Sequence, residues 1–345
     1  MSARADVGGG RPFVLGLAEE DQSGFSAEVM HGVEAAASEL GWRHLRVNDA
    51  QQEQRCDVLL AIGNVRLFPD LLRREKAAVR VLWHGETLPR PTGESGAAIH
   101  SLLPTGRMLD TVFAVAPGSD RVRALRDGRE KAALVREPLA NLRLLQRALP
   151  AFDRIVVDSH DRAEGALRAG LRVSVVPYGY HESYAGPFQA AGDRPRDALL
   201  LAHMVGQHGR RQRLVGLVER QLADRGVVLD RLTSGTYGRR RSEILGQVRV
   251  VVDIHRLPGN NPGFRFIVAS AGGAALVSEP LARPEPLVPG VHYVEAHEDE
   301  MAEAVAALLA NEPARRGLVE AAQALLSGEL QMTRVLPRVL HGLAR

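Results

Sequence analysis

The sequence contains one cysteine, two lysines and few aromatic residues, and each shortage excludes a class of protein. Cys56, being alone, cannot form a disulfide within the chain and rules out a zinc site built from several cysteines. Aromatic residues make up only 4% of the chain, too few for the base-stacking platforms of nucleic-acid binders. No apolar run approaches the ~20 residues of a membrane helix, and the N-terminus lacks the apolar core of a signal peptide. We therefore expect a cytoplasmic protein without a membrane span or a nucleic-acid partner.

Arginine accounts for nearly all of the positive charge, because only Lys76 and Lys131 are lysines among the 44 basic residues. The arginines form no block with interleaved aromatic residues, so their abundance indicates a GC-rich genome rather than a nucleic-acid surface. The chain also has no Walker loop, no HExxH helix, no Ser–His–Asp order and no paired metal-ligand spacing. These absences argue against a hydrolase or a metalloenzyme.

Short apolar segments alternate with helical segments throughout residues 1–176, which we predict to be an N-terminal domain. The expected strands are 12–18, 42–47, 57–62, 79–83, 111–115, 154–157 and 172–176. The expected helices are 25–40, 66–76, 139–149 and 161–169. Such an alternation predicts a parallel sheet of the α/β class.

Residues 177–197 interrupt this pattern with proline, glycine and polar residues, which is typical of an interdomain linker. A second α/β series follows over residues 198–332. Its expected strands are 198–202, 227–229, 248–252, 274–278 and 291–294, and its first helix is expected at 210–222. An apolar stripe in 333–345 predicts a last helix that packs back on the N-terminal domain. The expected fold is therefore two doubly wound, Rossmann-like α/β domains facing a ligand-binding cleft.

The stretch 251–280 reads as a strand, a loop, a short helix and a second buried strand. The loop NNPG at 260–263 offers cap residues and a pre-set first turn to the helix 264–271. A helix that starts in this way directs its free N–H groups at the loop. Those donors, the positive end of the helix dipole and Arg265 together suit a phosphate or a diphosphate.

Three segments of the second half carry a family resemblance. They are VVDSHDRAEGALRAGLRVSVVPYGYHE, LLLAHMVGQHGRRQRLVGLVERQL, and VVDIHR followed by GFRFIVASAGGAALVSEPLARPEPLVPGVHYVEAHEDEMAEAVAALL. This ordered series resembles the C-terminal half of GT-B glycosyltransferases, closest to the CgeB-like (spore-maturation-type) branch of retaining sugar-nucleotide enzymes. The resemblance implies that a nucleoside diphosphate sugar binds the C-terminal domain as donor and the acceptor binds the N-terminal one. It further implies that neither a metal nor another cofactor is needed.

The resemblance also assigns roles to individual residues. Arg210 and Arg211, beside Gly206, match the basic residues that pair with the donor diphosphate, although adjacent arginines at a helix start are also common on solvated surfaces. Tyr237 and Gly238 match the turn that wraps the nucleobase, where a single tyrosine can equally serve packing. The loop that contacts phosphate and sugar corresponds to Asn261, Gly263 and Arg265.

One departure from the family concerns the ribose. Many retaining relatives carry two glutamates eight positions apart, and counting back from Gly272 places them at Gly259 and Ile267, neither of which is acidic. Glu279, at the end of a predicted strand, is the nearest candidate for the ribose, although it could instead cap the following loop.

The N-terminal half contributes the motif WHGE directly after a predicted strand. His84 could bind the transferred sugar or the acceptor, and Glu86 could orient the acceptor hydroxyl, because imidazole and carboxylate groups position or deprotonate nucleophiles near neutral pH. Alternatively, His84 is a histidine that bonds a neighbouring loop carbonyl.

These observations predict a hexosyltransferase-type glycosyltransferase that acts with retention and without a metal. Its expected partners are a nucleoside diphosphate sugar and an unidentified small-molecule or glycan acceptor. Two alternatives stay open: a non-catalytic module that binds nucleotide sugars, and a sugar-nucleotide epimerase of the same fold. The oligomeric state also stays open, a homodimer being one option.

Overall fold

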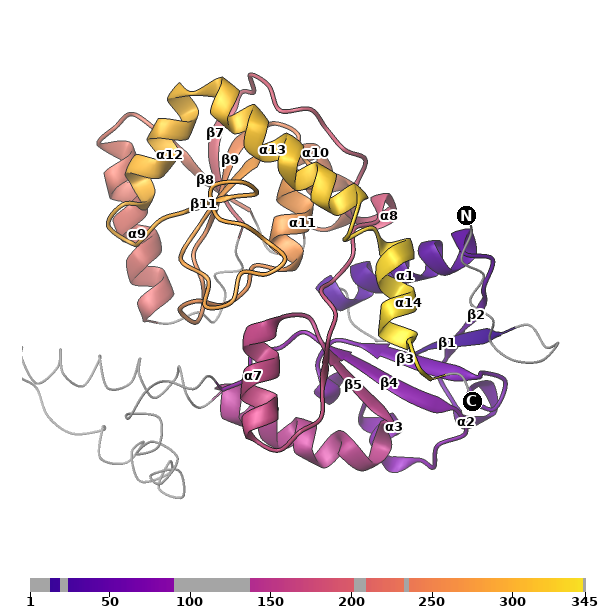
Figure 1. Cartoon of the computed structure of the whole chain (residues 1–345). Coiled ribbons are helices and arrows are strands. Elements are labelled where there is room, and N and C mark those ends of the chain that lie inside the picture. Colours follow the sequence, from indigo (N-terminus) through magenta and orange to yellow (C-terminus); the bar gives the residue numbers. More distant parts are fainter. Residues whose placement is uncertain (1–12, 19–23, 90–136, 202–208, 233–235, 344–345) are drawn as a thin grey trace, which may run out of the picture.

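The computed structural model describes residues 13–18, 24–89, 137–201, 209–232 and 236–343. This part of the chain forms two α/β units, each built on a parallel sheet (Figure 1). The strand expected at 111–115 and the site residue Gly206 lie outside the described residues. Within those residues no helix is long and apolar enough to cross a bilayer.

The first unit contains a parallel sheet with the strand order β2-β1-β3-β4-β5-β6. Its strands are β1 (Val14–Ala18), β2 (Arg43–Val47), β3 (Val58–Ile62), β4 (Val79–His84), β5 (Arg154–Val157) and β6 (Ser174–Val175). β1 and β3 are buried at every residue, because helices cover both faces of a parallel sheet. In the register of β4 and β5, His84 lies opposite Val157. Gly85 and Asp158, the next residues, therefore leave the sheet side by side.

Helices cover both faces of this first sheet, and each face has its own apolar cluster. The helical segments are α1 (Phe25–Glu39), α2 (Ala50–Glu53), η1 (Val65–Leu67), α3 (Pro69–Arg73), residues 137–148, η3 (Leu149–Ala151) and α7 (His160–Arg168). α1 packs Val29, Met30 and Val33 on one face. α7 packs Ala163 and Ala166 on the other.

The second unit has a parallel sheet with the order β11-β10-β9-β7-β8. Its strands are β7 (Arg196–Leu200), β8 (Leu229–Arg231), β9 (Val248–Asp253), β10 (Ala275–Ser278) and β11 (Val294–Glu295). β9 is the central strand, and its Val252 lies opposite both Leu200 and Val277. The strand ends that carry Asp253 and Ser278 therefore meet at one edge.

The helices of the second unit are α9 (Arg210–Ala223), α10 (Gly238–Leu245), α11 (Phe264–Ala271), α12 (Met301–Ala310) and α13 (Glu312–Ser327). α9 packs with α12 on one face of the sheet, and α11 packs with α13 on the other. α11 is almost entirely buried, because its sequence is apolar on every side except near Arg265.

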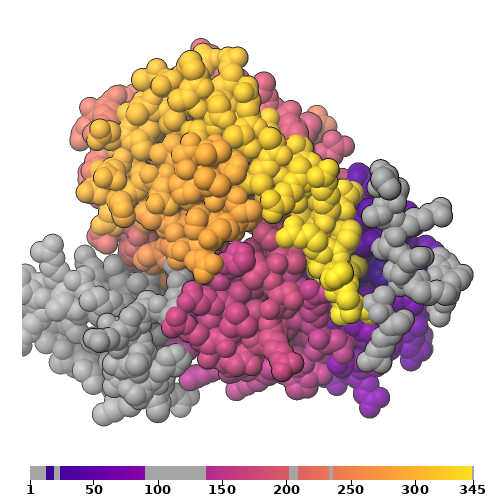
Figure 2. Space-filling model, viewed as in Figure 1, coloured from indigo at the N-terminus to yellow at the C-terminus, as the bar shows by residue number. Residues whose placement is uncertain are grey.

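The chain passes between the two units twice, and both passages lie close together. The first passage contains the short helix α8 (Glu182–Ala185), which packs on α1. In the second, the last helix α14 (Met332–Leu340) also packs on α1 (Figures 1 and 2). Tyr180 joins the passages, since its N–H donates to Leu330 O at 2.6 Å and its carbonyl accepts from Met332 N at 2.8 Å. A single apolar cluster therefore runs from one sheet to the other.

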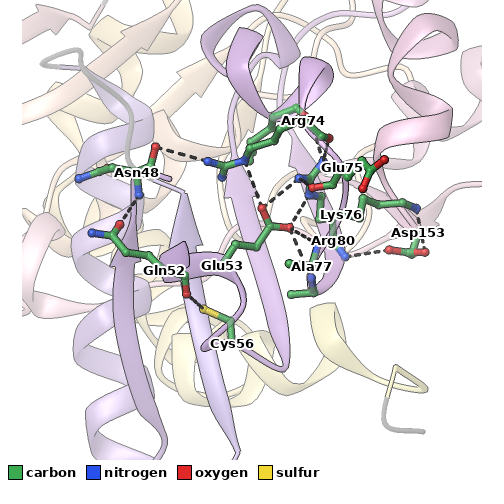
Figure 3. A network of polar contacts seen from close by, with 12 residues as sticks. Asn48, Gln52, Glu53, Cys56, Arg74, Glu75, Lys76, Ala77, Arg80 and Asp153 are labelled. Atoms are coloured by element: carbon green, nitrogen blue, oxygen red, sulfur yellow. Dashed lines mark hydrogen bonds and ion pairs between the residues drawn. The ribbon is translucent and has the colours of Figure 1, made fainter. Parts of the chain in front are cut away.

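A buried ion pair fastens the amino end of β4, on the side of the sheet away from its carboxyl edge (Figure 3). Arg80 Nε and Nη2 donate to the two carboxylate oxygens of Glu53 at 2.7 and 2.9 Å. Arg80 Nη1 donates to Leu71 O at 2.7 Å, and Nη2 also donates to Glu75 O at 3.1 Å. Both side chains are fully buried, and every guanidinium nitrogen of Arg80 has a partner.

Candidate functional site

A cavity of about 330 Å³ opens between the two units, at the carboxyl ends of both sheets. From the first unit it is lined by Phe25, Gly85, Glu86, Thr87, Asp158, Arg162 and Tyr178. From the second unit it is lined by Leu201, Arg211, Leu232, Thr236, Tyr237, Arg241, Arg256, Asn260, Asn261, Pro262, Gly263, Phe264, Arg265 and Val268. This is the position in which doubly wound sheets bind their ligands.

Arg211 is the cavity residue with the least compensation for its charge. It is only 5% exposed, and its Nε and Nη2 atoms have no hydrogen-bond partner within the described chain. Burial and the neighbouring charge of Arg265 lower the pKa of Arg211 to about 10, so the guanidinium is still protonated at neutral pH. Asp253 and Glu279 offset part of this charge, but a buried guanidinium with unbonded N–H groups is costly, which fits a site for an anionic ligand.

Arg265, in the first turn of α11, forms an ion pair with Asp253. Its Nε lies 2.8 Å from Oδ1 of Asp253, a fully buried residue at the end of β9. Burial alone would favour the neutral acid, but the charges of Arg265 and His255 hold the pKa of Asp253 well below its usual value. The ion pair fixes the Arg265 side chain, which is 25% exposed, at the cavity wall.

The start of α11 leaves backbone donors available beside these arginines. Its N-cap, Gly263, makes no side-chain cap, and Asn261 Oδ1 accepts from Gly263 N at 2.8 Å within the loop. Gly263 has φ +42°, a conformation that side-chain-bearing residues rarely adopt. Arg265 N already donates to Pro262 O at 2.9 Å, so within the described residues the N–H groups of Phe264 and Phe266 are the ones at the start of α11 that can serve an anion in the cavity.

The structure separates Arg210 from its neighbour Arg211. Arg210 does not line the cavity; its Nη2 is paired with Glu279 Oε1, and its Nη1 donates to His255 O at 3.1 Å. Glu279, only 4% exposed, also accepts from His255 N at 2.6 Å and likewise does not line the cavity. These two predicted ligand residues therefore bind each other and hold the loop after β9 to the start of α9.

The WHGE motif is also divided. His84 is fully buried and does not line the cavity, and burial together with the Arg162 charge lowers the pKa of the imidazole to about 3. Glu86 does line the cavity, and its Oε2 lies 3.8 Å from Nη2 of Arg256, which also pairs with Glu137. In this conformation Glu86 is within reach of a ligand and His84 is not.

Tyr237 lines the cavity, directly before the first residue of α10. Gly238 N, by contrast, donates to Glu28 Oε1 at 2.5 Å, so that N–H is occupied by the protein. Glu28 also pairs with Arg241, whose Nη2 donates to Tyr184 O at 2.9 Å. The predicted nucleobase turn is thus held in place by a carboxylate from α1 of the other unit.

Two further observations concern Asp158 and Arg162, which sequence reasoning did not assign, and the positions of the missing glutamates. Asp158 and Arg162 line the cavity from the first unit, and they form a buried pair. Asn260, in the loop before α11, and Val268, in the middle of α11, are among the cavity residues, and each lies one position after a residue expected for the missing glutamates. A polar residue directly after a predicted strand, as in VVDSH, was the available signal for Asp158.

The structure, but not the sequence, resembles known proteins. No protein-family model and no curated protein matches the sequence. Among solved structures, the HepE protein of Anabaena in complex with UDP-glucose aligns with a TM-score of 0.58 at 10% identity, over 94% of this chain and 98% of its own. An alpha-glucosyltransferase in complex with UDP and a DNA 13-mer containing an HMU base aligns with a TM-score of 0.59 at 9% identity. That match covers 97% of this chain and 100% of the other.

The chain has the GT-B fold. TarM is a further structural neighbour, with a TM-score of 0.53 at 9% identity over 84% of this chain and 55% of its own. The predicted fold class is therefore confirmed, with two parallel sheets flanked by helices and the cavity between them. At such low identity the likeness concerns the GT-B architecture, and the chemistry has to be argued from the residues of the cavity.

Proposed function

We propose that this protein is a glycosyltransferase that moves a sugar from a nucleoside diphosphate sugar to an acceptor hydroxyl. The observation that carries the proposal is Arg211, a buried guanidinium without a partner in the described chain, in the same cavity as the uncapped start of α11. Guanidinium groups and helix N-termini are the usual protein partners of phosphate groups. Both point to a diphosphate, which is the leaving group of this reaction.

In the proposed reaction the bond between the anomeric carbon and the diphosphate oxygen breaks, and its electron pair goes to that oxygen. The acceptor oxygen forms the new bond to the anomeric carbon and gives up its proton to an oxygen of the departing diphosphate. Arg211, Arg265 and the N–H groups of α11 would stabilise the charge that develops on the diphosphate. Because these groups already supply positive charge, we propose that no metal or other cofactor is needed.

The finer features of the proposal rest on similarity. UDP is the first nucleotide to test, because the HepE and alpha-glucosyltransferase structures are described as complexes with UDP or UDP-glucose. Tyr237, Leu201 and Leu232 would form the wall against which the base packs. Retention of anomeric configuration, and a place in the CgeB-like branch, follow from the sequence resemblance.

A non-catalytic module that binds nucleotide sugars is a second candidate. The two positions at which many retaining relatives carry glutamates are Gly259 and Ile267 in this chain, and the absence of both carboxylates favours it. Such a module would bind the donor as tightly as an enzyme does. It would differ only in chemistry, because it would release no sugar.

Two measurements on the purified protein test both candidates. Thermal unfolding with UDP, GDP, TDP, ADP and their sugar conjugates should show a rise in melting temperature for one nucleotide family, because a ligand of the native state stabilises it. Incubation with the matching donor should then release free sugar slowly. Stabilisation without release would favour the non-catalytic module, and no stabilisation by any nucleotide would contradict both candidates.

A further inference from the structure

Asp158 brings a carboxylate of the first unit to the cavity wall opposite the α11 loop. It directly follows β5, its side chain is 5% exposed, and it lines the cavity. A Cβ atom placed on Gly263 would lie 3.5 Å from Asp158 Oδ2. The carboxylate therefore faces the loop at the start of α11, from the opposite unit.

The two oxygens of Asp158 have different surroundings. Oδ1 accepts from Nη1 of Arg162, one turn into α7, and Ser159 Oγ lies 3.5 Å from the same oxygen. Arg162 Nη1 also donates to Ser159 Oγ at 3.1 Å, so the guanidinium is itself held. Within the described chain no other residue donates to Oδ2. One oxygen is thus fixed by the protein, and the other is turned to the cavity.

A phosphate group is a poor partner for this oxygen, because two negative charges at close range repel each other. The phosphate partners Arg211, Arg265 and the N–H groups of α11 come from the second unit. In a nucleoside diphosphate sugar the diphosphate joins the nucleoside to the sugar. With the base against Tyr237, Leu201 and Leu232 as proposed above, the sugar at the other end of the diphosphate would lie beside the α11 loop and next to Asp158. Carboxylates accept strong, charge-assisted hydrogen bonds from hydroxyl groups, which a sugar ring offers in number.

Burial supports this reading, because it raises the pKa of Asp158 to about 6 despite the opposing charge of Arg162. A hydroxyl donor would stabilise the ionised form that burial disfavours. Resting on the proposed function, we propose that Asp158 positions the transferred sugar by accepting a hydrogen bond from one of its ring hydroxyls through Oδ2. The residue would then determine which sugars the protein accepts without contributing to nucleotide affinity.

The test compares the affinity for a sugar nucleotide with the affinity for the bare nucleotide. Calorimetry would measure UDP and UDP-glucose, with GDP and GDP-mannose as a second pair, on the wild type, Asp158→Ala and Asp158→Asn. In Asp158→Ala the ratio of the affinity for the sugar nucleotide to the affinity for the bare nucleotide should fall by about tenfold. The affinity for the bare nucleotide should stay equal or rise. Asp158→Asn keeps an oxygen for Arg162 and protects the comparison if the alanine variant does not fold.

Glu164→Gln is the control on the same helix, because Glu164 lies on α7, pairs with Arg168 and does not line the cavity. Donors that each lack one sugar hydroxyl sharpen the test. For the wild type, one of these donors should bind no more tightly than the bare nucleotide. For Asp158→Ala, the same donor should bind as tightly as the complete sugar nucleotide does.

The outcomes separate this inference from the function on which it rests. If the wild type binds none of the four ligands, and TDP, ADP and their sugar conjugates do not stabilise it either, the proposed function fails and the inference fails with it. If the wild type binds the sugar nucleotides but both Asp158 variants keep the full gain from the sugar, the assignment of Asp158 is wrong and the proposed function stands.

Discussion

Arg80 and Arg211 are both buried arginines, yet their surroundings differ in kind. Arg80 donates to both oxygens of Glu53 and to backbone carbonyls, so each of its three nitrogens is satisfied (Figure 3). Arg211 has no partner for Nε or Nη2 within the described chain. The first arginine lies at the amino end of β4, and the second lies in the cavity at the carboxyl edge of the other sheet.

This contrast separates a structural charge from a ligand-binding one better than residue type or burial does. Removing one member of a fully bonded buried ion pair is costly, because it strands the other charge in the interior. An unsatisfied cation does the opposite, because it costs free energy until an anion arrives. Residues that hold the fold should therefore affect stability, whereas residues that hold the ligand should affect affinity.

The largest effect on stability is expected at Arg80. Arg80→Ala would leave the Glu53 carboxylate buried without its main partner and should lower the free energy of unfolding by about 3–5 kcal/mol. Chemical denaturation measures this change, with the exposed Arg213→Ala on α9 as control. Nucleotide affinity of the folded variant should equal that of the wild type; a loss of affinity would break the distinction between the two regions.

Arg210 lies between the two cases, because it sits beside the cavity but is paired with Glu279. Arg210→Ala leaves the Glu279 carboxylate with the His255 N–H as its partner within the described residues, so we expect a loss of stability of about 1–3 kcal/mol. Nucleotide affinity should fall by only a few fold. Denaturation and calorimetry on one preparation would measure both quantities. A tenfold loss of affinity with unchanged stability would show that Arg210 binds the ligand.

His84 should behave as a structural residue whose effect depends on pH. Its folded pKa of about 3 lies below the value near 6.5 of an exposed histidine, so between these values only the unfolded chain binds the proton. The free energy of unfolding should therefore fall as the pH drops below about 6.5, by about 1 kcal/mol per pH unit. His84→Leu should remove this part of the pH dependence in denaturation curves. A variant with the wild-type slope would show that the imidazole is accessible.

The sequence predicted the two sheets well, because both depend on local apolar patterns. β5 and α11 begin and end at the predicted residues, and other predicted strands differ by one to three residues at their ends. The helix α10 was not predicted, since GRRRSEIL has little apolar character and its first turn is held by Glu28 from the other unit. The short helix α8, which lies within the predicted linker, depends on its packing against α1 in the same way.

The cavity residues were harder to predict, because their roles depend on direction and on the other unit. Arg211 and Arg210 are equivalent by residue type, but Arg211 lies three residues before Leu214 on the buried face of α9. The spacing from Leu214 was thus a usable sign that Arg211, and not Arg210, lies on the buried face of α9. The pairing of Arg210 with Glu279, and the position of Asp158 opposite Gly263, arise from segments far apart in the sequence, which no local pattern reveals.

Arg211→Ala offers the most direct test of the account. Calorimetry would compare UDP with uridine on the wild type, on Arg211→Ala and on Arg213→Ala, which removes an exposed arginine from the same helix. A hydrogen bond between charged partners contributes about 1.5–3 kcal/mol, so Arg211→Ala should weaken UDP binding by about tenfold to a hundredfold and leave uridine binding unchanged. Its free energy of unfolding without ligand should stay equal to that of the wild type or rise. Wild-type UDP affinity combined with a loss of stability as large as that of Arg80→Ala would contradict the assignment of Arg211 to the diphosphate.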